Sequence, residues 1–68
     1  MSMQDINKIP REKWLTATQI LEILNSKGLE INYKNVSRFL LKGYKCGWIN
    51  RKNIPQYGHI QYIYRRTD

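Results

Sequence analysis

The sequence has few of the residues that build disulfides, metal sites and membrane spans. Its 68 residues include a single cysteine, Cys46, and a single histidine, His59. One cysteine excludes a disulfide within the chain, and one Cys with one His cannot supply the three or four ligands of a zinc site. Apolar runs reach only three residues, as at 39–41, whereas a spanning helix needs about 20. We therefore expect a soluble, cytoplasmic protein with no metal, no cofactor, no membrane contact and no signal peptide.

Acidic residues and catalytic motifs are also scarce. The five acidic residues are scattered along the chain, and none of the serines lies in a nucleophile-elbow sequence. The sequence contains no glycine-rich phosphate loop. A catalytic constellation needs a nucleophile, a base and an orienting group around a pocket, and a chain of this size has little room for one. We therefore expect a protein that is not an enzyme, with no small-molecule ligand.

Positive charge is present in excess, and it is concentrated in the second half of the chain. The net charge is +7. Residues 1–30 carry four basic and four acidic side chains, whereas residues 31–68 carry eight basic and one acidic side chain. Such an asymmetry is expected when one part of a fold is scaffold and another part meets nucleic acid or a different polyanion. The alternative is a protein that is basic only for solubility.

Length and periodicity predict one domain, residues 10–68, behind a flexible tail, residues 1–9. A 68-residue chain buries only about 60% of its unfolded surface, which is too little for two cores. The sequence shows no internal repeat and no linker, and its first nine residues have no sustained period. Pro10 suits the first position of a helix, where its missing amide proton would be unpaired anyway. This predicts a short helix over residues 10–14.

A helix that serves the core is predicted from residue 17 to residue 26 or 27. Thr16 and Gln19 have the spacing of a capping box, in which each side chain accepts a hydrogen bond from the backbone of the other residue. Gly28 suits the stop, because glycine tolerates the left-handed conformation just past a helix. A broad apolar stripe lies between these signals: Ile20, Leu21, Ile23 and Leu24.

A second helix, over residues 33–45, is predicted to be basic on one side. Asn32 suits its N-cap and Gly47 its stop. At about 100° per residue, one side carries Val36, Phe39, Leu40 and Gly43. The opposite side carries cations with no acid among them, flanked by one serine and one leucine: Lys34, Arg38, Lys42, Lys45, Ser37 and Leu41. Glycine inside a helix costs about 1 kcal/mol relative to alanine, so we expect either Trp14 or Tyr64 to pack against Gly43, or the helix to bend there.

Beyond the second helix the period changes from 3.6 towards 2, which predicts a β-hairpin. Residues 48–51 and 59–65 read as strands, and proline and glycine mark residues 52–58 as a loop that looks too long and polar for a tight turn. Two strands alone are marginal in water, so the hairpin should pack against the helices. Arg65 and Arg66 are predicted to be a basic tail.

Together these features resemble the winged helix-turn-helix family. In many members the second helix of the motif has an apolar residue, a basic residue two later, Leu four later, Gly eleven later and an aliphatic residue thirteen later. Here those residues are Val36, Arg38, Leu40, Gly47 and Ile49. A similar Leu15-Thr16-Ala17 entry precedes the supporting helix. The resemblance covers residues 10–66 and implies a mainly α fold with a β-hairpin wing: two or three helices and a two-stranded antiparallel sheet.

The resemblance implies that residues 33–45 form the recognition helix, in the major groove of DNA. It also implies that residues 52–58 form the wing, which reaches the DNA backbone or minor groove. Double-stranded DNA is therefore the expected partner. The candidate DNA-binding residues on the helix are Tyr33, Lys34, Ser37, Arg38, Leu41, Lys42 and Lys45. Those at the base of the wing and within it are Arg51, Lys52, Gln56 and Tyr57.

We therefore expect a small basic transcriptional regulator that reads duplex DNA. The many Ile, Lys, Asn and Tyr residues beside a single Ala indicate an AT-rich genome, so a nucleoid-associated protein of a microbe, plasmid or virus is expected. Two alternatives stand beside it. Charge alone does not distinguish DNA from RNA, so an RNA- or ribosome-binding winged helix is one. A protein-protein adaptor whose basic face docks an acidic partner is the other. A homodimer fits the first expectation, because many regulators pair to read two half-sites.

Overall fold

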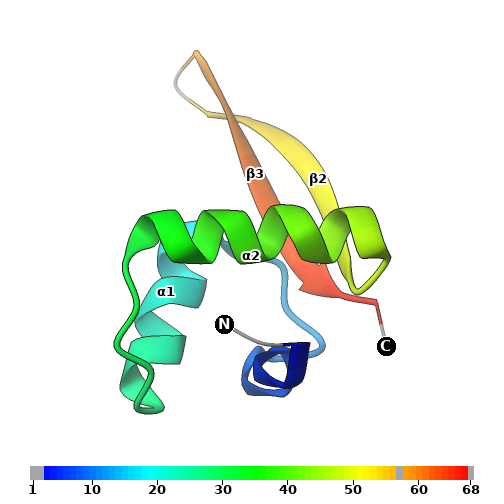
Figure 1. The fold of residues 1–68 in the computed structure, drawn as a ribbon. Helices are drawn as coiled ribbons and strands as arrows, with labels where there is room; N and C mark the ends of the chain where they lie inside the picture. Colours follow the sequence, from blue (N-terminus) through cyan, green and yellow to red (C-terminus); the bar gives the residue numbers. More distant parts are fainter. Residues whose placement is uncertain (1–2, 57, 68) are drawn as a thin grey trace.

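The computed structural model describes residues 3–56 and 58–67 and has an α+β fold (Figure 1). In chain order the elements are a 3-10 helix η1 (Met3–Lys8), strand β1 (Leu15–Thr16), helices α1 (Ala17–Ser26) and α2 (Tyr33–Cys46), and strands β2 (Ile49–Gln56) and β3 (His59–Arg66). The strands form one antiparallel sheet in the order β1-β3-β2. The helices gather at one end of the molecule, and the β2–β3 hairpin extends beyond them (Figure 1).

Helix α1 begins and ends where its capping residues predict. The Thr16 hydroxyl accepts a hydrogen bond from the Gln19 amide at 3.2 Å, and Gln19 Oε1 accepts one from the Thr16 amide at 2.9 Å. This reciprocal pair satisfies two amides that the first turn of a helix leaves without a partner. Past the other end, Gly28 has φ of 96°, and the Leu29 amide donates to the Leu24 carbonyl at 3.1 Å. The predicted helix is therefore confirmed.

Helix α2 also follows its prediction and continues one residue further, to Cys46. Asn32 Oδ1 accepts a hydrogen bond from the Asn35 amide at 2.9 Å, as an N-cap does. At the other end Gly47 takes a left-handed φ of 89°, and the Trp48 amide donates to the Gly43 carbonyl at 2.8 Å. Residues 27–32 form the connection between the two helices.

Gly43 lies inside α2, which is helical on both sides of it. A Cβ added at Gly43 would lie 2.6 Å from Ile49 Cγ1 and 3.5 Å from the Trp48 ring. The predicted neighbours, Trp14 and Tyr64, are therefore wrong. Only two residues separate the end of α2 from Ile49, which begins β2, so the chain turns back and packs against its own helix. Gly43 leaves the space that the Ile49 side chain occupies.

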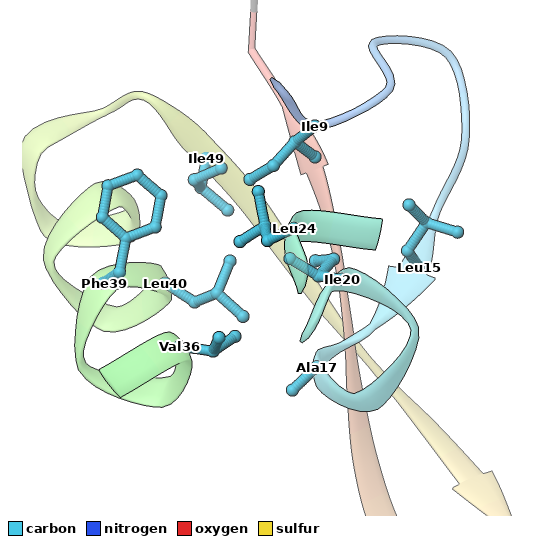
Figure 2. Packing of buried hydrophobic residues seen from close by; sticks show 9 residues of the cluster. All are labelled: Ile9, Leu15, Ala17, Ile20, Leu24, Val36, Phe39, Leu40 and Ile49. Carbon is cyan, nitrogen blue, oxygen red and sulfur yellow. The ribbon is translucent and has the colours of Figure 1, made fainter. Parts of the chain in front are cut away.

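One hydrophobic core joins the two α-helices to the sheet (Figure 2). Its buried side chains point toward one another, and several elements contribute them: Ile9, Leu15, Ala17, Ile20, Leu24, Val36, Phe39, Leu40 and Ile49. The ring centroids of Phe39 and Trp48 lie 6.2 Å apart, and Trp48 packs against this core. Burying an aliphatic side chain contributes about 1.5–3 kcal/mol, so this cluster is the main apolar contribution to the fold.

The sheet has three strands, and the predicted two-stranded sheet is wrong. Leu15 and Thr16 form the third strand, β1, which pairs with Tyr64 and Ile63 of β3. Two residues are too few to show an alternating pattern. Both also have a second role, since Leu15 is a core residue and Thr16 is the N-cap of α1. The sequence signal of the helix therefore masks that of the strand.

The β2–β3 hairpin is longer than predicted. Pairing continues to Gln56 and His59, which leaves only residues 57 and 58 between the strands. The predicted long loop over residues 52–58 is therefore wrong. Pro55 indicated that loop, but β2 lies at the edge of the sheet, where a missing amide proton need not interrupt a ladder.

The N-terminal segment contains η1, where the sequence predicts a tail, and the predicted helix over residues 10–14 does not form. Ile9 is only 2% exposed and belongs to the core. The Lys27 ammonium donates to the Lys8 carbonyl at 2.8 Å and so connects the end of α1 to the end of η1. A 3-10 helix this short has no amphipathic period of its own, so the sequence pattern does not indicate it.

Arg66 holds the same segment from the last strand. It is 8% exposed and donates to the Ile9 carbonyl at 3.2 Å and to Asn7 Oδ1 at 3.3 Å. The prediction that Arg66 belongs to a basic tail is therefore wrong. Its partners lie more than fifty residues away in the sequence, and no local pattern reveals such a contact.

Candidate nucleic-acid interface

Helix α2 presents a basic face on the side opposite the core. Because Val36, Phe39, Leu40 and Gly43 are buried, residues offset from them by about half a turn point outward. Leu41, 44% exposed, lies among the outward-pointing cations. The exposed residues on this side, called the basic face below, are Lys34, Arg38, Leu41, Lys42 and Lys45.

Among the described residues, none of the cations of the basic face pairs with an acidic side chain. Helix α2 itself contains no acid. Exposed helix faces that serve solubility commonly mix charges of both signs at one-turn spacing. The positive charge of this face is therefore available to an external anion.

A hollow of about 270 Å³ opens along one side of the basic face, lined by Asn35, Arg38, Phe39 and Lys42. Arg38 and Lys42 are one helical turn apart, so their side chains are neighbours on the helix surface. The hollow therefore offers a guanidinium, an ammonium and the Asn35 amide, which are groups that hydrogen-bond phosphates, sugars or base edges.

The other side of α2 faces the hairpin and is aromatic. Tyr33 and Tyr44 of α2 and Tyr62 of β3 are 54%, 43% and 38% exposed. Arg51 of β2 lies between two of these rings, with Cζ 4.2 Å from the Tyr44 centroid and 4.3 Å from the Tyr62 centroid. These four residues are called the tyrosine flank below. Ser37, half-buried, follows Tyr33 by one helical turn on this side of α2.

Tyr64 is half-buried beside the tyrosine flank. Burial raises the pKa of its hydroxyl above the usual value of 10.0, the positive charge of Arg51 lowers it in part, and Tyr33 and Tyr62 also raise it. A second hollow, of about 170 Å³, opens here between the starts of both helices and β3. It is lined by Ala17, Thr18, Tyr33, Gln61, Tyr62 and Tyr64.

Lys52 lies on the opposite face of the sheet from Arg51, because side chains alternate along a strand. Its ammonium is 4.3 Å from the centroid of the Trp14 ring, and Arg65 Cζ is 4.9 Å from the same centroid. The structure therefore brings Arg51 to α2 and separates Lys52 from it. Of the remaining wing candidates, Tyr57 lies outside the described residues, as does the side chain of Gln56.

Sequence reasoning missed Tyr44 and Tyr62 as parts of this surface. A signal was present for Tyr44, which follows Tyr33 by eleven residues, or about three helical turns, and so shares its side of α2. For Tyr62 the signal would have been strand alternation, which places it on the same face of β3 as Tyr64. Arg51 joins that face through its pairing with Tyr64.

No protein-family model matches the chain, and comparisons with curated proteins and with solved structures gave no match either. Within residues 3–56 and 58–67, no three His, Cys, Asp or Glu side chains gather where they would bind a metal ion. Nor does a helix in that part of the chain have the length and apolarity needed to cross a membrane. Cys46 is exposed at the end of α2.

Proposed function

We propose that this protein is a small DNA-binding protein of the winged helix-turn-helix type, a transcriptional regulator that binds duplex DNA with the basic face of α2. The observation that carries the proposal is the row of exposed cations, with no acid among them, on one side of a 14-residue helix. Helices α1 and α2 are joined by a short connection at residues 27–32. In helix-turn-helix proteins the second helix of such a pair enters the major groove.

The hairpin supports the winged form of this proposal. Two residues separate the end of α2 from the start of β2, and β3 returns along β2 to pair with β1. The hairpin thus stands next to α2, and both of its strands extend past the helices (Figure 1). With α2 in the major groove, a projecting hairpin can reach the adjacent backbone or minor groove, as a wing does.

Within this proposal the cations of the basic face have two roles. Lys34, Lys42 and Lys45 neutralise phosphates, which releases counterions and makes binding strongly salt-dependent. Three such contacts predict that log affinity falls with log salt concentration with a slope of about −3. Arg38, in the middle of the face, is the residue placed to donate to O6 and N7 of a guanine, because its planar fork fits that edge.

The test compares two duplexes, one selected by this protein from a random pool and one of scrambled sequence, by fluorescence anisotropy at about 50 mM salt. Arg38→Ala should weaken binding to the selected duplex about 5- to 100-fold and binding to the scrambled duplex much less. Lys45→Ala should weaken both alike, and Lys27→Ala, just after α1, should weaken neither.

Three outcomes would change the proposal. Equal losses on both duplexes for Arg38→Ala would remove its base-reading role. Tighter binding to a folded RNA than to duplex DNA at equal salt would favour the RNA-binding alternative. Absence of any nucleic-acid binding at about 50 mM salt, where the electrostatic attraction is strong, would reject the proposal and favour an adaptor for an acidic protein.

A further inference from the structure

The tyrosine flank and the hollow beside it form a second surface, apart from the basic face. The hollow has a volume of about 170 Å³. A protein cavity of about 150 Å³ is enough to hold benzene, so this hollow has the size of a single flat ring. Its aromatic lining comes from three tyrosines on two elements: Tyr33 of α2, and Tyr62 and Tyr64 of β3.

The polar lining of the hollow suits a ring with hydrogen-bonding edges. The exposed Thr18 offers a hydroxyl at the edge of the hollow, and a hydroxyl can both donate and accept a hydrogen bond. A nucleobase combines a π face, which stacks on tyrosine, with an edge of donors and acceptors. A purely apolar ring would leave the Thr18 hydroxyl without a partner, at a cost in binding free energy.

Arg51 adds an anion-binding group next to the same hollow. Its guanidinium lies 4.3 Å from the centroid of Tyr62, which lines the hollow, and 4.2 Å from that of Tyr44. Two ring contacts fix the side chain, and among the described residues Arg51 has no acidic partner. A guanidinium held in this way can donate two parallel hydrogen bonds to a phosphate.

We infer that the tyrosine flank binds one unpaired nucleotide of a single-stranded nucleic acid, with the base in the hollow against Tyr33 and Tyr62 and a phosphate at Arg51. A base inside a duplex is paired and stacked and cannot enter the hollow. Exposed aromatic rings beside cations are the usual means of binding single strands. Single-stranded DNA and RNA share this chemistry. The inference goes beyond duplex binding by α2 and does not depend on it.

The experiment uses the full chain and three labelled ligands at equal salt: a DNA single strand of about 12 nucleotides, the same sequence as RNA, and a blunt DNA duplex. Tyr62→Ala should weaken single-strand binding about 5- to 100-fold and lower its ratio to duplex binding, as expected when a stacking ring is lost. Tyr62→Phe keeps the ring and should keep the ratio. Arg38→Ala, on the basic face, should shift the ratio in the opposite direction.

Each remaining outcome decides between the proposals. Equal losses on single strand and duplex for Tyr62→Ala would overturn the nucleotide site, and so would wild-type binding to the duplex without binding to either single strand. Single-strand binding without duplex binding would instead overturn the role of α2 and keep this site. If Tyr62→Ala lowers the melting temperature, Thr18→Ala is used in its place, because Thr18 is exposed on the first turn of α1. An unchanged ratio of single-strand to duplex binding in Thr18→Ala would overturn the site. Comparison of the DNA single strand with the RNA of the same sequence shows which of the two the protein binds more tightly.

Discussion

Helices α1 and α2 are alike on the inside and different on the outside. Each begins at a side-chain N-cap, Thr16 or Asn32, and each is followed by a glycine with positive φ, Gly28 or Gly47. Each also buries a stripe of residues in the same core. Outside, α1 carries Glu22 and no cation, whereas α2 carries four cations and no acid. Packing of the core therefore determines the residues on the inner side of each helix, whereas the residues on the outer side can differ according to function.

The four cations of α2 lower the stability of the helix, and packing of the core does not require them. Lys34 and Arg38, and Arg38 and Lys42, are like-charge pairs four residues apart. Each such pair destabilises a helix by about 0.2–0.5 kcal/mol. Helix α1 reaches the same core without them. Stability therefore does not account for the charges of α2, whereas the anionic ligand proposed above would.

The largest effects on stability are expected on the inner sides of the two helices, which pack into the same core. Leu24 of α1 and Leu40 of α2 are both 0% exposed, so truncation of either to alanine should lower the free energy of unfolding by about 2–5 kcal/mol. Leu41, the next residue along α2, is 44% exposed, and Leu41→Ala should change stability by less than about 0.5 kcal/mol. Urea unfolding measures all three. A cost for Leu41→Ala equal to that for Leu40→Ala would contradict the assignment of the two sides.

A smaller effect on stability is expected at Gly43, where α2 packs against Ile49 of β2. In Gly43→Ala, the new Cβ would lie 2.6 Å from Ile49 Cγ1, and overpacking of this kind costs about 1–3 kcal/mol. Alanine regains about 1 kcal/mol through its helix propensity, so a net destabilisation of up to about 2 kcal/mol is expected. The control is a double-mutant cycle by urea unfolding, because Gly43→Ala should be neutral or stabilising when Ile49 is also alanine. Additive costs would mean that Ile49 is not the obstacle.

The two α-helices could be predicted from the sequence because their signals are local. Caps and period lie within a few residues of each other, as for Thr16 with Gln19 in α1. The rest of the fold depends on distant contacts. Strand β1 has two residues and forms only because β3 pairs with it. Arg66 holds the N-terminal segment through hydrogen bonds to residues more than fifty positions away.

The basic face could likewise be predicted, since helical spacing alone gathers its residues. The tyrosine flank could not, because it depends on how two strands pair with each other and pack against α2, which the sequence does not show. Once β2 is known to continue through Lys52, strand alternation separates that residue from Arg51. Pro55 hid this continuation, since an edge strand tolerates a proline that a central strand would not.

Substitutions on the outer side of α2 and next to α1 should differ in how they change the salt dependence of DNA binding. Lys45→Ala removes one phosphate contact in the proposed complex and should reduce the slope of log affinity against log salt by about 0.9. Lys27→Ala, just after α1, should leave that slope unchanged, because Lys27 binds the Lys8 carbonyl. Anisotropy titrations at several salt concentrations measure both. Equal changes for the two variants would show that the two helices do not differ as proposed.

The smallest effect is expected at Tyr64, which lies where the starts of both helices meet β3. Its pKa is raised by burial, so the unfolded chain loses this proton at a lower pH than the folded chain does. The stabilisation is therefore complete below about pH 10 and is lost as pH rises through the folded pKa. Because Tyr64 is only partly buried, the loss should be small. Stability measured from pH 8 to pH 11 should fall less steeply for Tyr64→Phe than for the wild type, since the variant has no hydroxyl to titrate. Identical slopes would show that burial of this hydroxyl does not oppose its ionisation and that the junction of the two helices admits water freely.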